Sequence, residues 1–337
     1  MAPMDDTGSD PLASATAWLA DKQKVALATV TRTWGSAPRP AGSQMAVRED
    51  GAFNGSVSGG CVEGSVIGEA QSALNDGKPR NLKFGVSNED AWAVGLACGG
   101  TIEVHVTPVL AQAQQAALAA LKHARDKGIA VALATDLATG ESRVVYPDER
   151  GADALTEVAR VQARRDQSGS VEIDRKSWFL TIFNPALDLA IIGAVHIAQP
   201  LARMAALANY AVRIIDPRTA FATAERFPGV KLSHQWPDEA LAAAPLTSRS
   251  AIVALTHDPK LDDPALTAAL TSPAFYIGAL GSKATHAKRL ERLHAQGFSS
   301  ADVARIHGPI GLNIGARSPA EIAIAILGEI TAQLRQA

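Results

Sequence analysis

The residues best suited to chemistry in this sequence are its two cysteines, each of which stands beside a pair of glycines. Cys61 follows Gly59–Gly60, and Cys98 precedes Gly99–Gly100. Glycine pairs let backbone N–H groups approach a ligand closely, so a thiol held there can meet an anionic or metal-bearing guest, and the N–H groups would favour its thiolate form. The alternative is that each cysteine is a small side chain of the core, where unbonded cysteine is common.

A second candidate site follows a predicted buried strand, 187–192, where the chain turns directly into a helix. Gly193 suits the tight turn of a dinucleotide-binding fingerprint, but Val195 replaces the glycine that normally admits the pyrophosphate. Asp216 lies 23 residues after Gly193, where a carboxylate can bind ribose hydroxyls. These features predict a Rossmann-like domain, and they leave open whether it binds a nucleotide or has lost its cofactor.

Other polar loops follow the predicted strands of this half. Ligands of open α/β sheets bind outside the carboxyl ends of the strands, so we expect these loops to converge on one crevice. The predicted cofactor-binding residues are Gly193, Ala194, Val195, His196, Ile197, Asp216, Pro217, Arg218, Thr256, His257, Asp258, Gly278, Gly281 and Ser282. Gly281 and Ser282 stand at a predicted helix start, where backbone N–H groups can bind an anion. The segment does not fit a Walker P-loop, which excludes nucleotide hydrolysis by that route.

Basic residues and histidines are less specific signals. Arg32 and Arg39 lie in a loop, where they either grip a phosphate or carboxylate or pair with surface acids. The four basic residues between Lys283 and Arg292 are expected to form a solvated helix face or, as the less common alternative, a docking surface. The histidine spacing gives no support for a permanent metal site.

Composition narrows the class of protein. The 337 residues are 47% hydrophobic and 20% charged, with a formal net charge of −2, which is typical of a globular protein and disfavours nucleic-acid binding. The acidic, polar start of the chain does not resemble a secretory signal, and no uninterrupted apolar segment predicts membrane insertion. Two cysteines 37 positions apart argue against a structural disulfide, and we therefore expect a cytoplasmic protein.

The element pattern predicts two domains with a boundary after Pro185. Residues 1–185 are expected to form a mixed α+β, strand-rich N-terminal domain that carries both cysteines. Residues 186–337 are expected to form an α/β domain with a Rossmann-like, doubly wound parallel sheet. The predicted helices are 11–22, 61–77, 110–127, 153–165, 197–209, 282–297 and 318–334. The predicted strands are 25–30, 44–47, 55–57, 101–106, 129–135, 142–146, 171–173, 179–183, 187–192, 212–215, 252–255 and 275–277.

Several segments, in the same order along the chain, carry a resemblance to a known family. They are 31–64, with Trp-Gly-Ser-Ala-Pro-Arg-Pro and Ser-Gly-Gly-Cys-Val-Glu-Gly, and then 95–100, 193–199, 215–218, 255–259, 275–282 and 306–312. On these motifs the sequence resembles the XdhC/CoxI family over nearly its whole length. Many relatives read Gly-Ala-Gly-His where this chain reads Gly193 to His196.

The resemblance implies a maturation factor, an accessory protein more than a turnover enzyme. Its partner would be the apo-form of a molybdenum hydroxylase such as xanthine dehydrogenase, aldehyde oxidoreductase or carbon monoxide dehydrogenase, with a cysteine desulfurase as a second candidate. Its cargo would be the molybdenum cofactor, molybdopterin, which it would protect, help to sulfurate and insert.

Within this interpretation Cys61 or Cys98 would contact molybdenum, relay sulfur or hold copper. The cargo is expected between the two domains, and a homodimer is a plausible assembly. Two alternatives stay open: an oxidoreductase that uses a flavin (FAD) or NAD(P), and a copper chaperone that uses both thiols.

Overall fold

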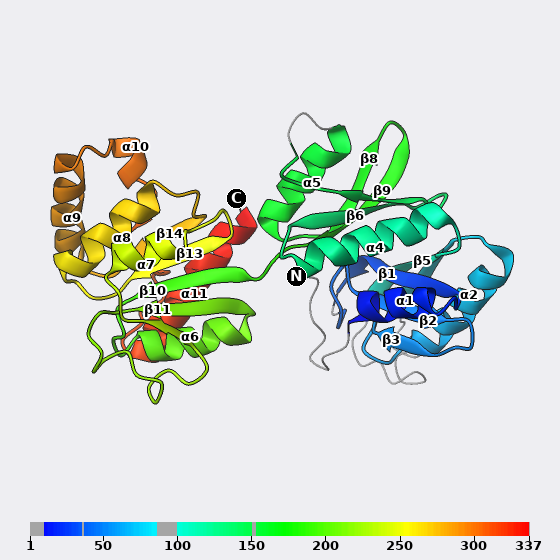
Figure 1. Ribbon diagram of the computed structural model, residues 1–337, viewed down its shortest axis with the longest axis horizontal. Coiled ribbons are helices and arrows are strands. Elements are labelled where there is room, and N and C mark those ends of the chain that lie inside the picture. Colours follow the sequence, from blue (N-terminus) through cyan, green and yellow to red (C-terminus); the bar gives the residue numbers. More distant parts are fainter. Residues whose placement is uncertain (1–9, 36, 86–99, 150–152, 337) are drawn as a thin grey trace. The chain divides into compact units, whose positions relative to one another are not determined.

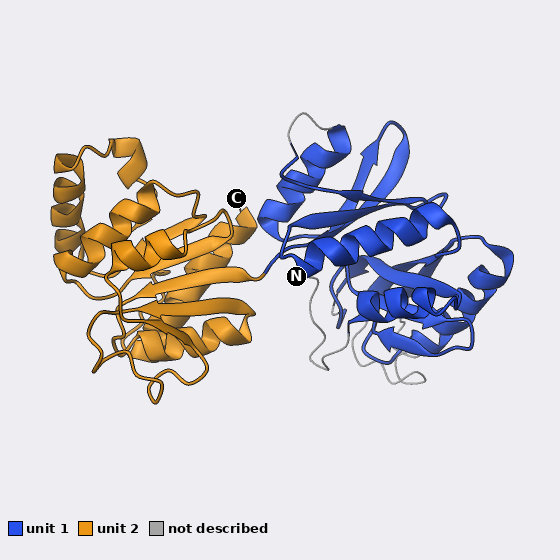
Figure 2. Cartoon of the chain, viewed as in Figure 1, with its two compact units in different colours: residues 1–185 blue, residues 186–337 orange. Residues whose placement is uncertain are grey.

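The chain folds as two units, residues 1–185 and residues 186–337, which are coloured blue and orange in Figure 2. The computed structural model describes residues 10–35, 37–85, 100–149 and 153–336. Cys98 and Gly99 lie outside the described residues, so the predictions made for them stay predictions.

Unit 1 is built on two antiparallel sheets (Figure 1). The first has the order β3-β2-β1-β5-β4 and the second the order β7-β6-β9-β8. The strands are β1 Val25–Trp34, β2 Gln44–Arg48, β3 Phe53–Gly55, β4 Arg80–Gly85, β5 Thr101–Pro108, β6 Val131–Asp136, β7 Ser142–Val145, β8 Gly169–Ile173 and β9 Lys176–Phe183. β4 was not predicted, since half of its residues are exposed and it contains Arg80, Asn81 and Lys83.

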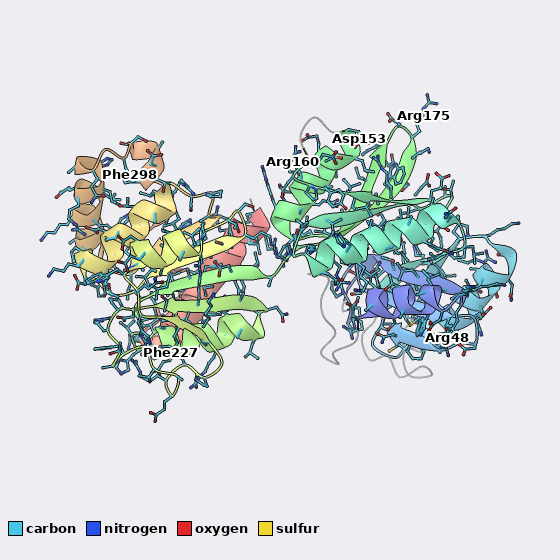
Figure 3. The ribbon with its side chains drawn as sticks, in the orientation of Figure 1. Arg48, Asp153, Arg160, Arg175, Phe227 and Phe298 are labelled. Atoms are coloured by element: carbon cyan, nitrogen blue, oxygen red, sulfur yellow. The ribbon has the colours of Figure 1, made fainter. Side chains whose placement is uncertain are left out.

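Helices cover the apolar faces of these sheets. They are α1 Pro11–Ala20, α2 Glu63–Asp76, α4 Gln112–Asp126 and α5 Ala154–Arg165. α2 buries Val66 and Ala70 against β1 and β2, while α1 and α4 pack on the opposite face of the same sheet. α5 packs on the second sheet. Its first turn is capped by Asp153, which is labelled in Figure 3 and accepts a hydrogen bond from the Thr156 N–H.

Unit 2 is a parallel sheet with helices on both faces. The strands are β10 Leu187–Ile192, β11 Tyr210–Ile215, β12 Lys231–Ser233, β13 Ser250–Ala254, β14 Tyr276–Ala279 and β15 Ile306–His307, in the order β12-β11-β10-β13-β14-β15. The helices are α6 Ala198–Leu207, α7 Pro237–Ala243, α8 Pro259–Leu270, α9 Lys283–Ala295, α10 Ser300–Val303 and α11 Pro319–Gln336. α6 and α11 share one core with the sheet, and α7 to α10 share the other.

This topology confirms the predicted fold class. Counting from β10, the strand order is 3-2-1-4-5-6, which is the order of dinucleotide-binding Rossmann folds. The order reverses between β10 and β13, so the ligand position expected for such a sheet is outside the carboxyl ends of these two strands. The predicted helix caps at Ser282 and Ser318 are also confirmed, since each hydroxyl accepts an N–H from the residue three positions on.

Candidate functional site

Cys61 lies in the loop that joins β3 to α2. Its side chain is partly buried and packs against the core beneath α2. Its backbone N–H donates to Ser58 Oγ at 3.0 Å, and the next N–H, of Val62, donates to the same oxygen at 2.9 Å. The thiol is therefore carried by a backbone that Ser58 fixes on both sides.

The glycine pair beside Cys61 points its N–H groups at a carboxylate of the protein itself. Glu63 Oε1 accepts from the backbone N–H groups of Val57 at 3.2 Å, Ser58 at 2.9 Å and Gly59 at 3.1 Å, while Oε2 accepts from Gly60 at 2.9 Å. We call these four N–H groups the anion nest. The donors that we expected to face a guest or the thiol are therefore bonded to Glu63.

Two hydroxyls complete the shell around Glu63. Ser56 Oγ donates to Oε1 at 2.7 Å and Ser58 Oγ donates to Oε2 at 2.5 Å. Only 7% of Glu63 is exposed. Burial alone would raise the pKa of Glu63, but the hydrogen bonds from Ser58, Ser56 and the backbone outweigh it and lower that pKa to about 2. The carboxylate is thus ionised at neutral pH.

In unit 2, the turn that follows β10 lies very close to the loop that follows β13. Gly193 has a φ of 100°, and a Cβ atom built there would stand 2.3 Å from Thr256 Cγ2. Only glycine satisfies both conditions. Since Gly193 follows β10 and Thr256 follows β13, this contact lies where the strand order reverses.

Asp216 lies at the end of β11 and is fully buried. Its Oδ2 accepts from the Ala194 N–H at 2.8 Å and from Arg218 Nη2 at 2.7 Å, while Oδ1 accepts from Arg218 N and Nε. Burial opposes ionisation, but the bonds from Arg218 and Ala194 lower the pKa of Asp216 below its usual range. Both oxygens of the Asp216 carboxylate, which we predicted to bind ribose, thus accept hydrogen bonds from the protein itself. Ribose binding stays a prediction.

The helix start after this turn offers few donors to an anion. α6 begins at Ala198, whose N–H donates to the Val195 carbonyl at 3.1 Å. The third residue of the helix is Pro200, which has no N–H. Val195 packs against the apolar core, His196 is exposed and Ile197 is partly buried. This turn therefore differs from a pyrophosphate site in two ways. Val195 replaces a glycine, and the helix start has few free N–H groups.

The loop after β13 is organised by a buried aspartate of α8. Asp262 Oδ1 accepts from Thr256 Oγ1 at 2.5 Å, and Oδ2 accepts from the His257 N–H at 3.1 Å. His257 itself is exposed and has a φ of 63°. Asp258 caps α8 by accepting the Lys260 N–H. Asp262 was not among the predicted site residues, since nothing in the sequence distinguishes it from Asp263.

The loop after β14 meets the β13 loop. Gly281 has a φ of 144°, and a Cβ atom there would be 3.1 Å from Thr285 Cγ2 and 3.7 Å from His257 Nδ1. Ser282 Oγ accepts the Thr285 N–H at 3.1 Å, which removes one donor from the predicted anion site. Gly278 has a different role, because a Cβ atom there would overlap Ile310 and Tyr276 in the core.

The basic cluster of α9 is the expected solvated face only in part, since Lys283 and Lys288 are exposed, whereas Arg289 is buried and Arg292 is partly buried. Arg289 is 1% exposed, donates to the Leu280 carbonyl at 2.9 Å and lies 3.4 Å from Asp262 Oδ2. Arg292 forms a two-point ion pair with Asp263. Burial raises the pKa of Asp262, while Thr256 and Arg289 oppose that rise. Arg289 was not predicted as a site residue, although it ties the β14 loop to Asp262 and hence to the β13 loop.

Apart from Gly278, which lies within β14, the predicted residues of unit 2 therefore follow the carboxyl ends of β10, β11, β13 and β14. Gly193 contacts Thr256, and His257 approaches Gly281. The hydrogen bond that Arg218 donates to Asp216 raises the pKa of Arg218 most, and the charge of Asp258 adds a smaller rise. Pro217, between Asp216 and Arg218, is partly buried. Over the ranges that the structure describes, no group of three His, Cys, Asp or Glu side chains is placed to hold a metal ion. None of the described helices is long and apolar enough to cross a membrane.

Comparison with known proteins defines the class. The model of the XdhC and CoxI family matches residues 18–85, and the model of the XdhC Rossmann domain matches residues 189–330. The chain belongs to the XdhC/CoxI family, as its motifs indicated.

Individual relatives cover most of the chain. The chain is 30% identical over 308 residues to the molybdenum cofactor insertion chaperone PaoD of Escherichia coli, covering 90% of this chain and 81% of PaoD. It is 29% identical over 322 residues to a probable xanthine dehydrogenase subunit of Bacillus subtilis, covering 93% and 94% of the two chains. A crystal structure of a xanthine dehydrogenase from Bacillus halodurans has a TM-score of 0.66 and 25% identity, covering 97% and 96%.

Proposed function

We propose that this protein is a maturation factor for a molybdenum hydroxylase, and that it binds the molybdenum cofactor and delivers it to the apo-enzyme. The observation that carries the proposal is the 30% identity over 308 residues to a molybdenum cofactor insertion chaperone. The second relative, a probable xanthine dehydrogenase subunit, supports a client of the xanthine dehydrogenase type.

We assign the cargo contact in unit 1 to Cys61. Its side chain is only partly buried, and the loop that carries it is fixed by Ser58 and Glu63. Thiolates are good ligands for soft metals and good carriers of sulfur. Cys61 is thus suited to hold the cargo during sulfuration. Cys98 is a second candidate for the same role.

We assign the nucleotide or pterin end of the cargo to the sheet edge of unit 2. His257 is the most direct probe there, because its side chain is exposed and lies beside Gly281. The engaged carboxylate of Asp216 makes binding through ribose hydroxyls, as in an FAD- or NAD(P)-dependent oxidoreductase, the less favoured alternative.

The test is to purify the full chain from a molybdenum-replete host and to quantify bound molybdopterin, flavin, nicotinamide, molybdenum and copper. We expect molybdopterin and molybdenum, and we expect the purified chain to activate an apo-xanthine dehydrogenase. Cys61→Ser should reduce both, with Ser65→Ala, an exposed position in the first turn of α2, as the matched control. His257→Ala should reduce cargo retention, whereas His294→Ala, an exposed histidine near the C-terminal end of α9, should not.

Three outcomes would contradict the proposal. A chain that carries neither molybdopterin nor molybdenum, and whose deletion leaves client activity intact, is not a maturation factor. Bound flavin with substrate-driven turnover would favour the oxidoreductase. Copper in place of molybdenum, lost in Cys61→Ser and in Cys98→Ser, would favour the copper chaperone.

A further inference from the structure

The anion nest beside Cys61 is complete before any guest binds. Four consecutive backbone N–H groups, from Val57 to Gly60, and the hydroxyls of Ser56 and Ser58 all donate to the carboxylate of Glu63. Nests of this kind bind phosphate and other anions in many proteins. Here the anion is supplied by the first residue of α2.

The same contacts reach the thiol through one shared residue. Ser58 Oγ donates to Glu63 Oε2 and accepts the N–H groups of Cys61 and Val62. Gly59 and Gly60 have φ values of 81° and 116°, yet a Cβ atom at Gly60 would contact nothing within 4 Å. The glycines are therefore needed for backbone direction, which turns their N–H groups toward Glu63, and not for space at Gly60.

We propose that Glu63 is a positioning residue for Cys61, which fills the anion nest, holds the thiol in place and excludes other small anions from the loop. The part that concerns cargo rests on the function proposed above. It follows that cargo reaches this loop through the thiol, while its phosphate must be bound elsewhere, because every N–H donor of the nest is occupied.

The variants differ in how many contacts they remove. Glu63→Ala empties the nest. In Glu63→Gln the amide oxygen can still accept the hydrogen bonds that Oε1 accepts in the wild type. The amide NH₂ group takes the place of Oε2, so the hydrogen bonds from the Gly60 N–H and the Ser58 hydroxyl are lost. Glu69→Gln is the matched control, since Glu69 is an exposed glutamate of the same helix whose carboxylate lies 3.6 Å from Arg80 Nε.

The experiment measures the rate at which iodoacetamide, a neutral reagent, alkylates Cys61 in the cargo-free full chain, read on the Cys61 peptide by mass spectrometry. We expect Glu63→Ala to react about tenfold faster and Glu63→Gln about threefold faster, because the loop loses charged hydrogen bonds. Glu69→Gln should react like the wild type. Formate added to Glu63→Ala should refill the nest and slow alkylation, whereas neutral formamide should not.

A wild-type rate in Glu63→Ala would overturn the proposal. If Glu63→Ala does not fold, a wild-type rate in Glu63→Gln overturns it equally. Inorganic phosphate should slow alkylation of Glu63→Ala but not of the wild type, and an equal effect on both would disprove the exclusion of anions. Cargo retention, measured in parallel, separates the two proposals: altered alkylation with unchanged retention leaves Glu63 as the positioning residue and removes Cys61 from the cargo contact.

Discussion

In two loops of this protein a carboxylate side chain accepts hydrogen bonds from backbone N–H groups, but the charges around the two carboxylates differ. In unit 1, Glu63 accepts the N–H groups of the loop that carries Cys61. In unit 2, Asp216 accepts the Ala194 N–H of the strand-end turn. In each loop, a glycine motif that resembles an anion site is already bonded to a carboxylate of the chain.

The difference lies in the partners of the two carboxylates. Asp216 is paired with the guanidinium of Arg218, so its charge is compensated within hydrogen-bond distance. The hydrogen bonds described for the Glu63 carboxylate all come from neutral donors, which are backbone N–H groups and serine hydroxyls. The Cys61 loop therefore keeps a net negative charge, whereas the turn of unit 2 does not. A glycine motif in the sequence thus shows where backbone N–H donors gather, but not whether those donors are free to bind a ligand.

The largest effect should come from the glycine of unit 2. Gly193→Ala adds a Cβ atom that overlaps Thr256, at a φ of 100°, and should lower the free energy of unfolding of unit 2 by about 4 kcal/mol. Gly60→Ala has a similar φ of 116° with open space around it, and should cost only about 1 kcal/mol in unit 1. Hydrogen exchange of peptides from each unit measures both. Equal effects of the two substitutions would show that Thr256 can move away from the added Cβ atom at little cost in free energy.

The next largest effect should be a loss of stability of unit 1 as the pH falls. His105 on β5 is 2% exposed, and burial lowers its pKa to about 4, against an opposing effect of Asp136. Because this pKa is below the unfolded value of 6.5, the stabilisation is complete above about pH 6.5. It falls by roughly 3 kcal/mol as the pH is lowered to 4. His105→Gln should flatten that dependence, as measured by urea unfolding at several pH values. An unchanged slope would contradict the assignment.

Glu63 should titrate at lower pH than His105. Its folded pKa of about 2 lies below the ordinary 4.5, so its contribution is full above about pH 4.5 and is lost as the pH falls toward 2. Glu63→Gln should cost unit 1 about 2 kcal/mol at pH 7 and almost nothing near pH 2. A cost that persists at pH 2 would mean that packing, and not charge, dominates. Measuring it in the His105→Gln background separates the two titrations.

The smallest effect should come from removing the cation of unit 2. Arg218→Ala leaves the buried carboxylate of Asp216 with its N–H donors alone. Because the Arg218 side chain is 39% exposed, we expect a loss of only about 1 kcal/mol, which shrinks in high salt. Arg226→Ala, which removes a charge from the same loop, is the control. A larger loss than in Glu63→Gln would reverse the ranking of the two loops.

The sequence was sufficient to predict the parallel sheet and its glycine turn, but not several shorter or interrupted elements. α8 was missed although its buried apolar residues, Leu261, Ala265, Leu266, Ala269 and Leu270, follow a helical spacing, because Asp262, Asp263 and Pro264 interrupt that pattern. The three-residue strand β12 and the short helix α7 were missed as well. β12 and α7 are too short to show a local pattern and are stabilised by tertiary contacts.

The candidate site was predictable in its position and not in its bonding. The loops at Gly193, Thr256 and Gly281 were predicted because each follows the carboxyl end of a predicted strand. Glu63 was overlooked, since its partners are backbone groups that no residue type reveals. The only available signal was an acidic residue in the first turn of a helix, three positions after the second glycine of a pair.

The bonding of the Cys61 loop also bears on how this segment can vary between homologues. Its four donors are main-chain groups, which every residue except proline possesses, so the side chain of Val57 adds nothing to the polar contacts, whereas the hydroxyls of Ser56 and Ser58 do. Sequence variation in this loop should be limited by the backbone direction at Gly59 and Gly60, by the hydroxyls of Ser56 and Ser58 and by the carboxylate of Glu63. A sequence search that requires Ser56, Ser58, Gly59, Gly60, Cys61 and Glu63 while leaving Val57 and Val62 open would therefore recover loops of the same architecture that a stricter motif overlooks.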